Sequence, residues 1–277
     1  DYKKAARIKI DFNINGLEEN VKDNIYVLKN HNDMIKLKDK INLLPNKSNI
    51  AIMGCGPTGV EIIGSLIDRP FKKFNIFAID GMERPISFFN RHLSNVILNI
   101  WNKNKINIHM NSFVKKVDNT VIYCNDNTKI KYDIGIWCGG VKNTTLTDTI
   151  INKYQNKLHN KRSSGIFVND FLQIKINKTI NSNDNNTINS AFAIGDCNMT
   201  CFPKTAQVAY QQGVYVGNYI NNPTNKSPFY FTDFGQFCYI GNNTSIYQGP
   251  YFQKSGYVIN LFNSLVQSYN LFKTKYF

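Results

Sequence analysis

The chain has 277 residues, of which 42% are hydrophobic and 13% aromatic, enough to bury a sizeable core in one or two domains. Its formal charge of +14 is compatible with nucleic acid, an anionic membrane or no particular partner, and we expect no nucleic-acid partner because the lysine and asparagine bias runs through the whole chain. No run of about 18 uncharged apolar residues occurs, so we expect a soluble or peripheral protein.

The amino end, residues 1–12, has neither the apolar core of a secretory signal nor the pattern of a transit peptide. We therefore expect that any targeting segment was removed or never included. The six cysteines are scattered without the spacing of a secreted scaffold, so we expect them to be reduced. The four histidines have no metal-ligand spacing, and we predict no metal site.

The first clear element is a βαβ unit. Residues 49–65 form an apolar run, a glycine turn and the start of a helix, and residues 74–80 form a second apolar run. A helix-length segment separates the two runs, as a parallel, doubly wound sheet requires. The sequence therefore predicts an α/β fold.

The turn of this unit fits the G-x-G-x-x-G fingerprint of dinucleotide-binding proteins. Gly54 permits the tight turn, Gly56 lets the backbone approach a pyrophosphate, and Gly59 lets the helix pack closely on the strand. The helix start that includes Pro57 and Thr58 is then expected to bind the phosphates.

A carboxylate follows the second apolar run, where dinucleotide-binding proteins hold the adenosine ribose. Asp80 lies 21 residues beyond Gly59, in position to accept hydrogen bonds from a ribose 2'-hydroxyl. It would repel a 2'-phosphate, which favours NAD over NADP. Arg84 lies close enough in sequence to weaken this preference.

Short strand-like runs come next, and they are expected to form a small antiparallel insert: 106–110, 112–117, 121–124 and 130–132. Residues 132–137 then return as an apolar strand. Trp137, Gly139 and Gly140 at its end are expected to line the nucleotide, because paired glycines permit close approach of the backbone.

The following part of the chain predicts a second site at a helix start. Residues 176–189 are rich in asparagine and are expected to be a surface loop without function. A strand at 191–194 stops at Gly195 and Asp196, and a helix is predicted from Thr205. A carboxylate there can bind a polyol, and helix amides can stabilise a reduced ring; an ordinary strand end is an equal alternative on these residues alone.

The last predicted element is an amphipathic helix at 258–272, followed by Lys273 and Lys275. One stripe is apolar, and amide and hydroxyl side chains lie opposite: the apolar stripe is Val258, Leu261, Phe262, Leu265, Val266, Tyr269 and Phe272. The helix could lie in an anionic membrane interface, or pack in the core or a dimer, and the sequence leaves these equal.

Four segments together resemble type II NADH:quinone oxidoreductases: GCGPTGVE (54–61), WCGGV (137–141), AIGDC (193–197) and PKTAQVAYQQGVY (203–215). Their order and spacing also agree with that family. Residues 12–33 and 234–243 are similar to further segments of it, so the resemblance covers nearly the whole chain. It implies FAD, NAD and a quinone substrate.

The resemblance also implies roles for single residues. The residues expected to contact the flavin are Gly195, Asp196, Thr205, Ala206 and Gln207. Gln207 and Gln211, four apart on one helical face, would contact the quinone, although the residues alone favour solvated glutamines. Glu61 would place a carboxylate near the nicotinamide side of the flavin, although a glutamate is also simply favourable at a helix start. Cys197 and Cys201 lie where related disulfide reductases do not place their redox pair, so both are interpreted as structural.

The chain departs from the family because no glycine-rich βαβ unit for the ADP part of FAD precedes residue 49. We expect a Rossmann-like NAD-binding domain inserted in an incomplete FAD-binding Rossmann-like domain. The expected divisions are a linker and FAD-domain remnant at 1–40, the NAD domain at 41–145, the rest of the FAD domain at 146–230, and a membrane-associating segment at 231–277. The expected assemblies are a homodimer, or a complex with a partner chain that supplies the missing FAD segment.

The function that these expectations imply is that of a non-proton-pumping NADH:quinone oxidoreductase of the respiratory chain, peripheral to the mitochondrial inner membrane. Hydride would pass from NADH to FAD, and electrons would then pass to quinone. The alternatives are a flavin-dependent NADH reductase with a soluble acceptor, and a catalytically inactive structural paralogue or fragment.

Overall fold

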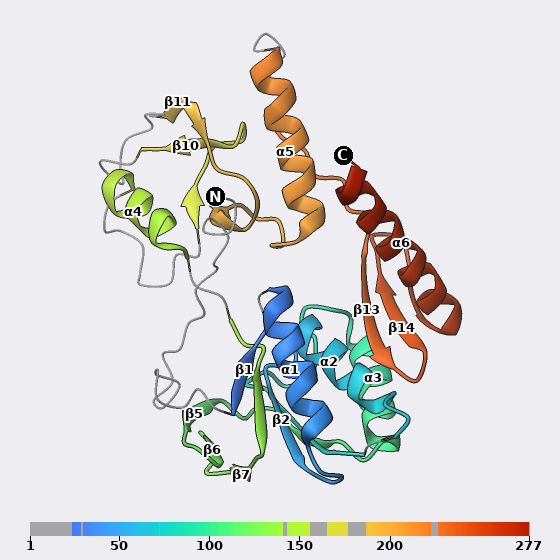
Figure 1. The fold of residues 1–277 in the computed structure, drawn as a ribbon. Helices are drawn as coiled ribbons and strands as arrows, with labels where there is room; N and C mark the ends of the chain where they lie inside the picture. Colours follow the sequence, from blue (N-terminus) through green and yellow to red (C-terminus); the bar gives the residue numbers. More distant parts are fainter. Residues whose placement is uncertain are drawn as a thin grey trace. The chain divides into compact units, whose positions relative to one another are not determined.

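The structure, a computed structural model, describes residues 24–28, 30–71, 73–140, 143–155, 165–176, 187–222 and 227–276. These residues form two compact units (Figure 1). The first unit contains residues 24–140 and 233–276, and the second contains the described residues from 143 to 232. Most of the amino-terminal segment considered above, residues 1–23, lies outside the described residues.

The first unit is built around a five-stranded sheet in the order β1-β8-β2-β3-β4, with every neighbouring pair parallel. Its strands are β1 (Ile25–Val27), β2 (Asn49–Met53), β3 (Asn75–Ile79), β4 (Asn107–His109) and β8 (Ile134–Trp137). The central strands β2 and β8 are almost fully buried, as strands that are covered on both faces must be.

Alternate residues of β2 point to opposite faces of this sheet. Ile50 and Ile52 pack in one cluster with α1 (His31–Leu43), α2 (Pro57–Ile67) and α3 (Arg91–Lys103). Ala51 and Met53 pack in a second cluster with an antiparallel insert of three strands: β5 (Val114–Val117), β6 (Val121–Cys124) and β7 (Lys129–Lys131). The sheet is therefore sandwiched between helices and the insert.

These elements confirm the predicted βαβ unit at 49–80 and the predicted insert from 112 onward. The strand predicted at 106–110 is present, but its assignment to the antiparallel insert is wrong. Its residues form β4, which pairs in parallel with β3, because α3 carries the chain back to the start of the next parallel strand.

A small antiparallel sheet near the carboxyl end packs on α2. It consists of β13 (Gln236–Gly241), β14 (Thr244–Gln248) and β15 (Gln253–Gly256). Cys238, Ile240 and Ile246 join the core cluster that holds the three helices. A Cβ added to Gly64 of α2 would lie 2.6 Å from the Gly241 amide nitrogen, so helix and strand meet backbone to backbone.

The last helix, α6 (Tyr257–Tyr276), contains the predicted amphipathic stretch and docks by its polar side. Asn263 is only 5% exposed, and its amide donates to the Ser245 hydroxyl, which in turn donates to the Asn260 amide oxygen. The apolar side faces outward: Leu265 is 66% exposed, and Phe262 is more than half exposed. Packing of the stripe from Val258 to Tyr269 in the core of the unit is therefore excluded.

The second unit has α4 (Thr145–Tyr154), α5 (Ala206–Asn221) and two small sheets. β10 (Gln173–Lys175) pairs antiparallel with β11 (Thr187–Phe192), and β9 (Ile166–Phe167) pairs in parallel with β12 (Asn198–Met199). The helix predicted from Thr205 is confirmed as α5, and the strand predicted at 191–194 starts earlier, in β11. Most of the predicted asparagine-rich loop, residues 177–186, lies outside the described residues.

Within these ranges, no helix is long and apolar enough to cross a membrane. The two units divide the chain between residues 140 and 141 and between residues 232 and 233. The domain boundaries expected from the sequence, at 40/41, 145/146 and 230/231, stay a prediction. Residues 24–40 supply β1 and most of α1 to the first unit.

Candidate functional site

The glycine turn after β2 is held in a conformation that requires glycine at two positions. Gly54 has φ of +103°, and an added Cβ would lie 2.7 Å from the Gly139 amide nitrogen. A Cβ on Gly59 would overlap the Gly54 carbonyl oxygen. The first and third glycines are thus explained by the tight turn and by helix packing, as the fingerprint predicts.

Gly56 has no comparable explanation within the protein. Its φ of −69° suits any residue, and an added Cβ would meet none of the described heavy atoms within 4 Å. Gly56 is also the N-cap of α2, where it offers no capping side chain, and Pro57 follows it. An uncapped helix start beside an open glycine fits a pyrophosphate that approaches the backbone.

Asp80 follows β3 and braces this turn. One carboxylate oxygen accepts from the Cys55 amide at 2.5 Å, and the other accepts from the Met82 amide at 2.8 Å. Each carboxylate oxygen can accept more than one hydrogen bond, so these two bonds leave acceptor capacity for the ribose contact predicted for Asp80. The bracing role was missed from the sequence, because both donors are backbone amides.

Arg84, the residue that weakened the preference for NAD, is occupied elsewhere. Its guanidinium donates to the Phe89 carbonyl at 2.8 Å, to the Ser94 hydroxyl at 2.6 Å and to the Ser87 carbonyl, and only 15% of its side chain is exposed. These bonds fold the arginine into the turn that precedes α3. They leave it poorly placed to bind a 2'-phosphate.

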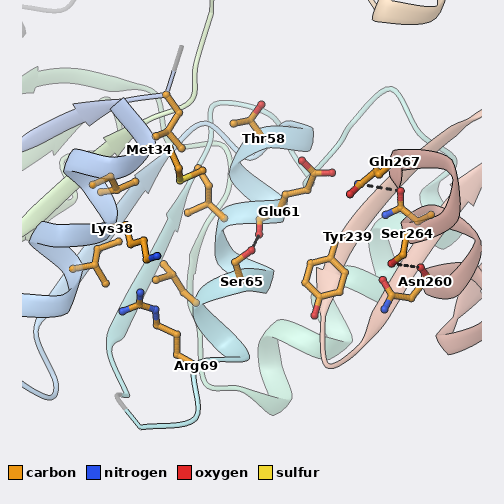
Figure 2. Close-up of a pocket in the computed structure, with 16 residues that line it drawn as sticks. Met34, Lys38, Thr58, Glu61, Ser65, Arg69, Tyr239, Asn260, Ser264 and Gln267 are labelled. Carbon is orange, nitrogen blue, oxygen red and sulfur yellow. Dashed lines mark hydrogen bonds between the residues drawn. The ribbon is translucent and has the colours of Figure 1, made fainter. Parts of the chain in front are cut away.

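Glu61 lies in the second turn of α2 and lines a cavity with Thr58 (Figure 2). Burial raises the pKa of this carboxyl to about 7, because a charge on the half-buried group is poorly solvated. At neutral pH Glu61 therefore exists in both protonation states. A carboxyl of this kind can exchange a proton with a bound group.

The end of β8, where Trp137 to Gly140 are predicted to line the nucleotide, lies against the glycine turn. Met53 of β2 pairs with Trp137, and the Cys138 amide donates to the Met53 carbonyl at 2.7 Å. Gly140 has φ of +74°, and an added Cβ would meet none of the described atoms within 4 Å. The first unit thus brings Gly54 to Gly59, Asp80 and the end of β8 together at one edge of its sheet.

The second unit holds the Gly195–Cys197 turn against α5. Gly195 has φ of +69°, and an added Cβ would lie 3.2 Å from the Ala209 side chain. The Gly195 amide donates to the Gln212 side-chain oxygen at 2.7 Å. Asp196 is exposed beside it, and the Lys204 ammonium donates to its carbonyl at 2.7 Å.

Gln212 is a residue that the sequence analysis did not single out. It is fully buried, and its oxygen also accepts from the Asn198 amide at 2.9 Å, while Asn198 donates to the Ala193 carbonyl. Gln212 therefore fixes the backbone at Gly195 from α5. The sequence could not reveal this role, because Gln212 follows Gln211 directly and nothing in the residue types shows which glutamine is buried.

The start of α5 is capped by Thr205, whose hydroxyl accepts from the Val208 amide at 3.3 Å. Ala206 and Gln207 follow in the first turn. Gln211 lies one turn further along and makes two bonds with the Thr232 backbone, accepting at 3.0 Å and donating at 2.8 Å. These bonds tether the segment after α5, and the flavin and quinone contacts of this helix stay predictions.

The model of the pyridine nucleotide-disulphide oxidoreductase family matches residues 8–213. A probable NADH dehydrogenase from Dictyostelium discoideum is 25% identical over 76% of this chain and 47% of its own length. A type II NADH:quinone oxidoreductase from Haemophilus influenzae is 25% identical over 73% of this chain and 46% of its own. The chain thus spans less than half the length of these curated relatives.

Solved structures share the fold. NDH2 from Plasmodium falciparum in complex with NADH superposes with a TM-score of 0.75 at 21% identity, covering 94% of this chain and 72% of that one. The water-forming NADH oxidase from Lactobacillus brevis superposes with a TM-score of 0.68 at 18% identity, covering 87% and 50%. Both confirm the predicted Rossmann-type α/β fold.

Proposed function

The chain belongs to the pyridine nucleotide-disulphide oxidoreductase family, and we propose that it serves NADH oxidation through FAD with a quinone as electron acceptor. The observation that carries the proposal is the open, uncapped start of α2 at Gly56, which nothing in the described protein fills. The relatives named NADH:quinone oxidoreductase support the choice of acceptor.

The first unit is proposed to bind the dinucleotide. The amides at the start of α2 stabilise the pyrophosphate, and Asp80 accepts from the adenosine ribose while it braces the turn. Gly140, where an added Cβ would meet none of the described atoms within 4 Å, leaves room at the end of β8. The folded-in Arg84 supports NAD rather than NADP.

The second unit is proposed to hold part of the flavin. Gly195 and Asp196 would contact its polyol and phosphate region, and the start of α5 at Thr205, Ala206 and Gln207 would face its ring. When bound, FAD supplies hydride acceptance from the nicotinamide and delivery of electrons to a second acceptor. Helix amides at the start of α5 stabilise negative charge, and Gln207 with Gln211 would bind quinone carbonyls.

We further propose that α6 attaches the protein to an anionic membrane surface. Its apolar stripe is exposed, its polar stripe faces the protein, and the carboxyl end is basic. Relatives named mitochondrial support a mitochondrial location, and we propose the inner membrane as the surface. The alternative role for the stripe is the contact of a homodimer. A partner chain that completes the flavin site is a further alternative for the assembly.

The absorbance spectrum of the purified full-length protein tests the proposal. Flavin bands at close to one flavin per chain, bleached by NADH without oxygen, are the expected result. A colourless protein that takes up no added FAD would instead identify a structural paralogue. Bleaching by NADH with unchanged activity after removal of α6 would identify a reductase with a soluble acceptor.

A further inference from the structure

A groove of about 690 Å³ runs along one side of α2 in the first unit (Figure 2). The floor is a single stripe of α2, on which Thr58, Glu61 and Ser65 follow one another at helical spacing. α1 forms one wall, and β13 with α6 forms the other. The groove begins at Thr58 and Glu61, which belong to the candidate site described above, and its remaining length along α2 has no role in the proposed function.

The part of the groove between α1 and α2 is lined by apolar side chains. Leu37 and Ile41 of α1 and Ile62 and Leu66 of α2 line it, with Met34, 50% exposed, above them. Its volume is that of pockets for single small ligands, which are about 300–1,000 Å³. Leu37, Ile41 and Leu66 are at most 7% exposed. An apolar chain placed here would therefore remove from water mainly the exposed Met34 and the half-buried Ile62.

Two cations lie on the same side of the groove. Figure 2 shows the Lys38 ammonium and the Arg69 guanidinium pointing into the space between α1 and α2. Within the described part of the chain neither forms an ion pair, although Arg69 donates to the Asn42 amide oxygen at 3.1 Å. The neighbouring Asp68 is engaged by the Tyr239 hydroxyl and the Asn242 amide.

The carboxyl of Glu61 does not oppose an anion strongly. It points to the α6 side of the groove, toward Gln267 and away from the two cations (Figure 2). Its pKa is raised to about 7 by burial, so at neutral pH it is only partly ionised. The remaining wall on α6 is formed by neutral amides and a hydroxyl: Asn260, Asn263, Ser264 and Gln267.

We propose that this groove binds a single-chain acyl carboxylate, with the carboxylate between Lys38 and Arg69 and the chain along Met34, Leu37 and Ile62. The positive charges of Lys38 and Arg69 determine at which end of the groove the carboxylate lies. Their ammonium and guanidinium groups are suitable hydrogen-bond donors to a carboxylate. The volume of the groove, about 690 Å³, suits one chain.

Calorimetric titration of the full-length protein with laurate, below its micelle concentration, tests the site. Saturable binding near one laurate per chain is expected, with affinity for dodecanol at least about tenfold weaker because the charge contact is lost. Equal affinity for laurate and dodecanol would overturn the proposal. So would binding that appears only with anionic phospholipid vesicles.

Matched charge substitutions on α1 distinguish binding in the groove from a general effect of the protein's charge on laurate binding. Lys38→Glu should weaken laurate binding at least about tenfold, whereas Lys36→Glu, an exposed site on the same helix outside the groove, should leave it unchanged. Arg69→Gln should weaken binding in the same direction. Equal effects of Lys38→Glu and Lys36→Glu would contradict the site. NADH binding by the same variants should not change, so the result is independent of the nicotinamide site.

Discussion

At the scale of single residues, the carboxylate of Asp80 links the glycine turn after β2 to the end of β3. Each of its oxygens accepts from a backbone amide, and an asparagine can reproduce only one of the two bonds. We therefore expect Asp80→Asn to lower the free energy of unfolding by about 1–3 kcal/mol and to weaken NADH binding about tenfold.

A matched control exists at the other end of the same sheet. The Asp133 carboxylate accepts from the Asn49 amide at 2.7 Å, at the start of β2 rather than at its end. Asp133→Asn should destabilise the protein without changing the NADH dissociation constant measured by calorimetry. Equal NADH affinity in both variants would show that Asp80 does not contact the nucleotide.

Glu61 makes stability depend on pH. The pKa of Glu61 in the folded protein, about 7, lies above its ordinary value, so folding favours the protonated carboxyl. The stabilisation that this gives the folded state is fully present below about pH 4.5 and is lost as the pH rises through about 7. This carboxyl alone should lower the free energy of unfolding by up to about 3 kcal/mol over that range. In Glu61→Gln, the free energy of unfolding measured with urea should no longer show this fall between about pH 4.5 and about pH 7. If it fell as much as in the wild-type protein, Glu61 would not have the raised pKa.

Gln212 is proposed to position the Gly195 turn rather than to touch a ligand. Gln212→Met keeps the volume but leaves the Gly195 amide and the Asn198 amide without their acceptor, which should cost about 2–3 kcal/mol. Hydrogen exchange at the Gly195 amide should accelerate in this variant. Gln211→Met, which breaks only the bonds with Thr232, is the control, and identical exchange at Gly195 in both would rule the role out.

At the scale of elements, α6 presents its apolar stripe outward, and this exposure predicts binding to vesicles. Phe262→Glu with Leu265→Glu should abolish co-sedimentation with anionic vesicles while leaving thermal stability unchanged, because both side chains are exposed. Asn99→Glu with Asn102→Glu, at exposed positions of α3, adds the same charge elsewhere and should have no effect. Undiminished sedimentation of the α6 variant would mean that the stripe serves another contact.

The elements also show what the sequence can predict. The βαβ unit at 49–80 was predictable, because buried apolar runs and a glycine turn mark strands and helix start locally. The docking side of α6 was not, since a helical period defines two faces without saying which one meets the protein. Here the buried Ser245 hydroxyl decides, by bonding Asn260 and Asn263. The role of Gln212 was not predictable for a similar reason. Gln211 and Gln212 are adjacent glutamines in the sequence, and only the tertiary structure shows that Gln212 is the one buried against the Gly195 turn.

At the scale of the whole molecule, the proposed reaction needs both units, because one holds the nucleotide turn and the other the Gly195 turn and α5. The basic chain, with 33 lysines and arginines against 19 acidic residues, favours approach to anionic surfaces and dinucleotides alike. Activity should therefore fall as salt screens these charges.

The most direct test of the central claim is quinone-dependent NADH oxidation by the purified protein in the presence of FAD and anionic vesicles. We expect turnover that requires flavin and is supported by NADH much better than by NADPH. Flavin-loaded protein that reduces no quinone with NADH, or that uses NADPH equally well, would contradict it.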